Sequence, residues 1–257
     1  MRVRAGTKTA RNVPFPGSLD VATGPGCSLL RCNAFGRREV PRPLMKPAYW
    51  DDATHALSRC DPVLRRLVRW HPGIHLRQRS DPFTTLARAI VGQQISVKAA
   101  EAIWKRFVVA AGARPGRGSL KLLPTRVAGL AVPALRGCGL SERKAEYLTD
   151  LARHFDSGRL DPAAWKQLDD EALIVALVDV KGIGRWTAEM FLIFHELRPD
   201  VLPVADLGLQ RAMAMHYRGG RKLTPRAMIT RAEAWRPWRS VATWYLWRSL
   251  DPIPVEY

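Results

Sequence analysis

Signals for the start of a helix recur along most of this chain. Four segments open with Asp or Thr followed by proline: DPVLRRLVRW from Asp61, DPFTTLARAIVGQQ from Asp81, DPAAWKQL from Asp161 and TPRAMITRAEAW from Thr224. Such a side chain can accept hydrogen bonds from the free amides of a first turn, and proline fits the first helical position. Ser141 offers the same cap to LSERKAEYLTDLARHF. Alternating apolar and polar runs are nearly absent, so the sequence predicts an all-α body of roughly ten helices.

Residues 1–46 differ from the rest of the chain. They are rich in Gly, Pro and Arg and show no helical or strand period, which predicts a disordered basic arm. The alternative is that the protein starts at Met45, where regular patterning begins. Residues 47–257 are enough for one helical domain. The start of the chain lacks the apolar segment of a secretory signal, and no apolar run is long enough to span a bilayer.

The charge of the chain indicates the class of partner. Its 257 residues carry a formal net charge of +18, which favours a polyanion, either nucleic acid or an acidic membrane surface. The four cysteines form no CxxC pair, so neither a disulfide framework nor a zinc site is expected. We expect a cytoplasmic protein.

A turn with two glycines interrupts the helical pattern in LVDVKGIGRWTAEMFL. A tight turn between two helices leaves backbone amides pointing outward at the start of the second helix, and these amides and the helix dipole suit a phosphate. Gly182 and Gly184 allow close approach of the backbone, while Lys181 and Arg185 add positive charge. These four residues are therefore candidates for binding DNA phosphates without reading sequence. A plain helix–helix turn is the alternative.

The same segment resembles the helix-hairpin-helix of a superfamily of DNA glycosylases. Three other segments are also similar to that family: DPFTTLARAIVGQQISVKAA, GLSERKAEYL and WRPWRSVATWYLW. The similarity runs from Tyr49 to Tyr257. It is greatest to the alkylation-repair branch, DNA-3-methyladenine glycosylase II. The resemblance implies a helical fold of two lobes with the active site in the cleft between them, and a hairpin at about residues 172–196.

The resemblance also implies a catalytic acid. In the family an aspartate follows the hairpin, and Asp206 in VLPVADLGLQR stands at the matching place. Breaking an N-glycosidic bond builds positive charge on the sugar, which a carboxylate can stabilise while it orients or deprotonates a water. Alternatively, Asp206 merely caps the helix that follows; both roles are compatible, because a cap favours the ionised carboxylate.

Family positions that face an extruded base fall on three residues. Aromatic walls suit a cationic alkylated base, and the matching residues are Trp186, Met190 and Trp247. Gln94 matches the position from which the family inserts a side chain into the duplex, with Gln93 as a less certain neighbour. The alternatives are that the first three are core side chains and that the glutamine is a solvated helix end.

Two further family features concern the hairpin. Lyase members carry a nucleophilic lysine just after the hairpin glycines; Trp186 occupies that position here, and Lys181 precedes the turn. We therefore expect base excision with water and no β-elimination. Family hairpins often hold a monovalent cation through backbone carbonyls, which would fall near Val178, Val180 and Ile183.

The resemblance thus implies a monofunctional DNA glycosylase of base excision repair that hydrolyses 3-methyladenine and 7-methylguanine from double-stranded DNA. We expect a nucleoid-associated monomer that needs no cofactor. An iron–sulfur cluster is not expected, because the last cysteine, Cys138, precedes the hairpin. The alternatives are a preference for deaminated or ring-opened bases, a non-catalytic DNA-binding module and a membrane-surface protein. Asp206 argues against the binding module, since an acid there would repel phosphate.

Overall fold

The computed structural model describes residues 46–78, 80–113 and 120–250. By its internal contacts the chain divides into Met1–Arg42 and Pro43–Tyr257, and every described residue belongs to the second unit. The arm predicted for residues 1–46 therefore lies outside the described residues, apart from Lys46.

The described residues form α-helices and two short 3-10 helices, with no β-strand among them. The predicted all-α class is confirmed. The α-helices are α1 (Trp50–Cys60), α2 (Pro62–Trp70), α3 (Pro82–Gly92), α4 (Val97–Ala110), α5 (Pro124–Ala128), α6 (Val132–Gly137), α7 (Glu142–Asp156), α8 (Asp170–Val178), α9 (Arg185–Phe194), α10 (Leu207–Arg218), α11 (Pro225–Ala232) and α12 (Arg239–Arg248). The 3-10 helices are η1 (Trp165–Gln167) and η2 (Glu233–Trp235).

The predicted caps explain where four of these helices begin. Asp61, Asp81, Ser141 and Thr224 each accept a hydrogen bond from a first-turn amide of the helix that follows. The prediction of an α-helix after Asp161 was wrong. The carboxylate of Asp161 accepts the Ala163 amide at 2.9 Å, and the chain then makes turns and η1. From Asp161 to Gln167 the one buried side chain is that of Trp165, so this segment has no apolar face that an α-helix could pack.

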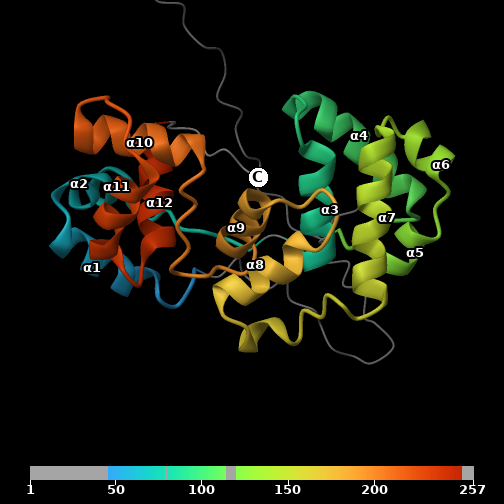
Figure 1. Cartoon of the computed structure of the whole chain (residues 1–257), viewed down its shortest axis with the longest axis horizontal. Helices are drawn as coiled ribbons and strands as arrows, with labels where there is room; N and C mark the ends of the chain where they lie inside the picture. Colours follow the sequence, from blue (N-terminus) through green and yellow to red (C-terminus); the bar gives the residue numbers. More distant parts are fainter. Residues whose placement is uncertain (1–45, 79, 114–119, 251–257) are drawn as a thin grey trace, which may run out of the picture. The chain divides into compact units, whose positions relative to one another are not determined.

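Two groups of helices pack among themselves within Pro43–Tyr257. α1 and α2 pack on α12, which also contacts α10, while α7 packs against α3, α5 and α6. α9 contacts members of both groups (Figure 1): it lies against α3, and its last residue, Phe194, contacts the rings of Trp244 and Trp247 in α12. α9 and its neighbours therefore place residues from distant parts of the chain side by side.

None of the helices among the described residues is long and apolar enough to cross a membrane.

Candidate active site

The hairpin predicted at about residues 172–196 is formed by α8 and α9 and the turn between them. Gly182 has φ +83°, which glycine adopts readily and other residues rarely do. A Cβ on it would lie 2.2 Å from Cδ2 of Tyr147 in α7. The amide of Lys181 donates to Oδ2 of Asp150, also in α7, at 2.9 Å. The turn is therefore fixed against α7, and glycine at 182 is required by the protein's own packing.

Gly184 lies in a different environment from Gly182. It precedes α9 as its N-cap, with φ −87° and no side-chain capping hydrogen bond. A Cβ on Gly184 would meet no described atom within 4 Å. The positive end of the α9 dipole is thus exposed beside the exposed Lys181. This arrangement suits a phosphate from outside the chain.

Arg185, also predicted to bind phosphate, is engaged by two carboxylates. Its Nη1 and Nη2 each donate to Glu171 at 2.7 Å, and its Nε donates to Glu189 at 3.1 Å. Hydrogen bonding to Arg185 lowers the pKa of Glu171, while burial raises the pKa of Glu189. Binding of phosphate by Arg185 stays a prediction. In this structure Glu171 and Glu189 compensate its positive charge, and its hydrogen bond to Glu171 joins α9 to α8.

Asp206 is buried at the start of α10, with 7% of its surface exposed. Its Oδ1 accepts the Leu209 amide at 2.6 Å, so the capping role is present. The carboxylate also receives two indole N–H groups: Trp247 Nε1 donates to Oδ1 at 2.8 Å and Trp186 Nε1 donates to Oδ2 at 2.9 Å. The structure therefore brings the predicted acid together with two predicted pocket residues, from α9, α10 and α12.

The three predicted pocket residues differ in exposure. Trp186 is 38% exposed, so its ring is accessible beside the carboxylate. Trp247 is partly buried and stacks on Phe194, with ring centroids 5.6 Å apart and planes 12° apart. Met190 is 7% exposed and belongs to the hydrophobic core. Trp186 is thus the most exposed of the three.

The two candidate wedge residues have separate environments. Gln93 is half-buried, and its Nε2 donates to the Gly182 carbonyl at 2.9 Å. Gln94 is exposed and has φ +56°, in the left-handed region, just after α3. Backbone strain of this kind clusters at functional sites. Of the two, Gln94 is the one placed to reach an external partner.

The carbonyl groups predicted to hold a cation belong to the hairpin turn. The Val180 carbonyl accepts the Ile183 amide at 3.1 Å, and Val178 ends α8 with 42% of its surface exposed. Carbonyl oxygens have two lone pairs and suit hard cations. Binding of a monovalent cation by these three carbonyls stays a prediction. Within the described ranges, no group of three or more His, Cys, Asp or Glu side chains could hold a metal.

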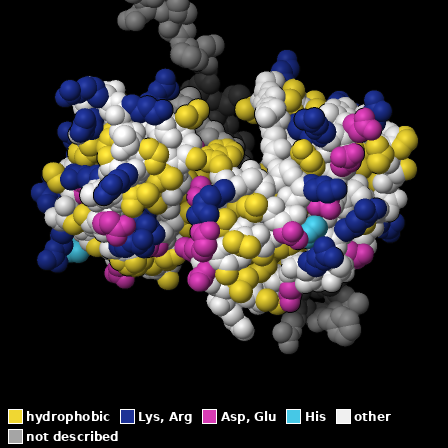
Figure 2. All heavy atoms as spheres, in the orientation of Figure 1, with side chains coloured by type: hydrophobic (Ala, Val, Ile, Leu, Met, Phe, Trp, Pro, Cys, Tyr) yellow, Lys and Arg dark blue, Asp and Glu magenta, His cyan; other side chains and the backbone are white. Residues whose placement is uncertain are grey.

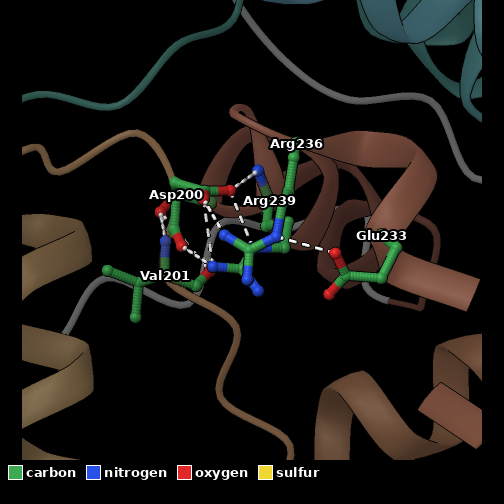
Figure 3. A network of polar contacts seen from close by, with 6 residues as sticks. Asp200, Val201, Glu233, Arg236 and Arg239 are labelled. Carbon is green, nitrogen blue, oxygen red and sulfur yellow. Dashed lines mark hydrogen bonds and ion pairs between the residues drawn. The ribbon is translucent and has the colours of Figure 1, made fainter. Parts of the chain in front are cut away.

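A network that the sequence did not reveal fixes the segment before α10 to the start of α12 (Figure 3). Asp200 accepts from Arg236 Nη1 and from Arg239 Nε, each at 2.7 Å, and the Arg239 amide donates to the same carboxylate at 3.3 Å. The Val201 amide donates to Ser240 Oγ at 2.9 Å. These contacts therefore fix the segment that leads into α10 against α12, the helix that carries Trp247. No local pattern indicates these pairs, which lie far apart in sequence.

Positive charge is spread widely over the described surface. Figure 2 shows Lys and Arg side chains scattered over one face, with acidic and hydrophobic side chains between them. A distributed charge of this kind attracts a polyanion without defining one contact.

Comparison with known proteins identifies the family of the chain. The family model described as HhH-GPD superfamily base excision DNA repair protein matches residues 87–240, a range that contains the hairpin and Asp206. The chain belongs to the HhH-GPD superfamily. The predicted family is thereby confirmed.

Two relatives of the chain carry the name DNA-3-methyladenine glycosylase. The chain is 33% identical to DNA-3-methyladenine glycosylase 1 of Schizosaccharomyces pombe, over 75% of this chain and 84% of the relative. A putative DNA-3-methyladenine glycosylase of Bacillus subtilis is 32% identical. That match covers 73% of this chain and 66% of the relative, which is about two thirds of its length. These relatives place the chain in the alkylation-repair branch.

A solved structure agrees with the sequence relationship. A DNA-3-methyladenine glycosidase from Bacillus halodurans has a TM-score of 0.71 and 34% identity, and the match covers 77% of this chain and 89% of that one. The S. pombe glycosylase in complex with abasic DNA has a TM-score of 0.63 and 32% identity, covering 77% of this chain and 96% of that one.

Proposed function

We propose that this protein is a monofunctional DNA glycosylase that removes alkylated bases such as 3-methyladenine and 7-methylguanine. The observation that carries the proposal is the buried Asp206 carboxylate, held by Trp186 and Trp247 within a family of base excision repair proteins. In a non-catalytic DNA-binding module the same carboxylate would serve the fold alone, because a negative charge there weakens the binding of phosphate.

The chemistry follows from the position of that carboxylate. An extruded nucleotide brings its sugar to Asp206 and its base against the exposed ring of Trp186. As the C1′–N bond breaks, its electron pair leaves with the base, and a cationic alkylated base departs neutral. The carboxylate stabilises the positive sugar, and water adds to C1′. The water loses its proton to Asp206, which passes it to solvent.

The DNA-binding surface is built from the hairpin and the loop after α3. In the proposed complex, one phosphate lies at Gly184 and Lys181, where the α9 dipole is exposed. Gln94 enters the duplex at the space left by the flipped nucleotide, since its side chain is exposed and that of Gln93 is bound to the hairpin. The carbonyls of Val178, Val180 and Ile183 would hold a monovalent cation that stiffens the turn. The protein acts as a monomer on nucleoid DNA in the cytoplasm.

The test compares the wild type with Asp206→Asn on methylated duplex DNA, with the released bases separated by chromatography. Asparagine can keep the cap but lacks the negative charge. We expect the wild type to release 3-methyladenine and 7-methylguanine, and the variant to be slower by about 100-fold or more. The abasic strand should stay intact without added base or heat, because no lysine occupies the position of Trp186.

Folding and DNA binding of both proteins serve as controls, by thermal unfolding and fluorescence anisotropy. Binding without base release by either protein would replace the enzyme with the binding module. Full activity of the variant would mean that another group is the catalytic acid.

A further inference from the structure

Residue 208, two positions after Asp206, is a glycine within the first turn of α10. A Cβ at this position would lie 3.1 Å from Asp206 Oδ1, 3.1 Å from Trp247 Cδ1 and 3.2 Å from Trp247 Nε1. Asp206 Oδ1 and Trp247 Nε1 are the acceptor and the donor of the 2.8 Å hydrogen bond between these two residues. The side of α10 at Gly208 is therefore where the indole of Trp247 lies.

The backbone does not require glycine at this position. Gly208 is not among the described glycines with positive φ, and it stands in a helix, where glycine is less favourable than alanine. The local reason for glycine is thus the space beside Asp206 and Trp247, rather than conformational freedom.

We propose that Gly208 is a positioning residue for catalysis: the missing side chain lets Trp247 approach Asp206 and fix one carboxylate oxygen. This proposal rests on the glycosylase function proposed above. Oδ1 receives both the Leu209 amide and the Trp247 indole, so it is the anchored oxygen. Oδ2 is paired with the more exposed Trp186, so it is the oxygen that faces the sugar.

A methyl group at position 208 would displace the indole more than the acid. The Leu209 amide holds Oδ1 at 2.6 Å, and Trp186 holds the other oxygen. Trp247 stacks nearly parallel on Phe194, so its ring can slide along that surface. A shift of a few tenths of an ångström would lengthen the bond to Oδ1 and leave the carboxylate less well oriented.

The test is Gly208→Ala, with Gly137→Ala as the matched control. Gly137 ends α6, its φ is not positive, and a Cβ there would meet nothing within 4 Å. For each protein we would measure the single-turnover rate of base release, the Kd for duplex DNA, the Tm and the NMR signal of the Trp247 indole N–H. Trp247→Phe assigns that signal.

We expect Gly208→Ala to slow base release roughly tenfold, because small errors in the position of a catalytic group are costly. Its Kd and Tm should stay close to those of the wild type, and the Trp247 N–H signal should move upfield as its hydrogen bond weakens. The control should change none of these. In a Trp247→Phe background, Gly208→Ala should cause no further loss of rate.

An unchanged rate with an unchanged indole signal would overturn the proposal. So would a full tenfold loss in the Trp247→Phe background, because glycine would then act by another route. If the wild type releases no base from methylated DNA, the proposed function fails and the catalytic role of Gly208 with it; the NMR signal would still report whether Gly208 governs the hydrogen bond.

Discussion

At the scale of single residues, the two hairpin glycines have different physical reasons to be glycine. The sequence presents them as one motif, GIG, and predicts one shared role. In the structure, Gly182 is in the left-handed region against Tyr147, whereas Gly184 has ordinary backbone geometry and open space where a side chain would be. Packing explains the first. The second stands at the N-cap of α9, where glycine is favoured and leaves the helix amides open to an external phosphate.

Substituting these glycines one at a time should separate stability from DNA binding. Gly182→Ala should lower the free energy of unfolding by about 2–4 kcal/mol, from backbone strain and the clash with Tyr147. Gly184→Ala should change it by about 1 kcal/mol or less, yet weaken DNA binding roughly tenfold, because a methyl group would hold the phosphate away from the α9 amides. Urea unfolding and fluorescence anisotropy measure the two effects. Equal effects of both substitutions on binding and stability would contradict this assignment.

At the scale of helices, Asp61 joins the start of α2 to three other elements. Its Oδ1 accepts two first-turn amides of α2, and its Oδ2 accepts from Tyr217, Arg231 and Trp235 at 3.0–3.1 Å. The carboxylate is 1% exposed. α2 is therefore fixed to α10, α11 and η2 through one buried charge that is fully hydrogen-bonded.

Removing that carboxylate should cost far more than removing an ordinary cap. Asp61→Ala should lower the free energy of unfolding by about 3–5 kcal/mol, since it leaves buried donors and Arg231 without their acceptor. Thr224→Ala, which removes an exposed cap from α11, should cost about 1 kcal/mol. Chemical denaturation of both variants measures the difference. Similar losses for the two would show that Asp61 acts only as a cap.

The cap of Asp61 could be predicted from sequence, and its other partners could not. Capping depends on neighbours two or three residues away, so Asp61, Asp81, Ser141 and Thr224 were predicted correctly. Tyr217, Arg231 and Trp235 lie 156 to 174 residues from Asp61. Asp161 shows the limit of the local rule, because the same Asp-Pro start led to turns and η1 in a segment whose one buried side chain, that of Trp165, gives no apolar face.

The candidate site shows the same division. Asp206, Trp186 and Trp247 came from resemblance to a family, and the structure places their side chains in direct contact. Resemblance to a family could not predict the space at Gly208 or the hydrogen bonds of Asp200 to α12. Each depends on how α12 packs against α10 and the segment before it.

At the scale of the whole molecule, one buried histidine makes stability depend on pH. His195, at the end of α9, lies 3.2 Å from Thr85 Oγ1 and 3.4 Å from Gln78 Nε2, and it stacks on Phe191. Burial lowers its pKa from 6.5 to about 4, against an opposing effect of Asp81. The folded protein therefore favours the neutral ring, which links α9 to α3 and to the segment before it.

The sign of the effect follows from proton binding. Above pH 6.5 both states hold a neutral ring, and the contribution to stability is complete; between pH 6.5 and about 4 only the unfolded state binds the proton. Stability should thus fall by about 3 kcal/mol across this window. His195→Gln should unfold with a shallower dependence on pH there, measured by urea denaturation at each pH. Parallel curves for the two proteins would show that His195 does not carry the effect.

The carboxylate of Asp206 serves architecture as well as chemistry. It begins α10 and receives hydrogen bonds from α9 and α12, so a substitution that removed the acid would also loosen a junction of three helices. A mutation that abolishes activity by replacing Asp206 should therefore also lower the stability of the fold. Retention of this aspartate in a relative is not by itself evidence that the relative is still an enzyme, because selection for a folded protein would preserve it too.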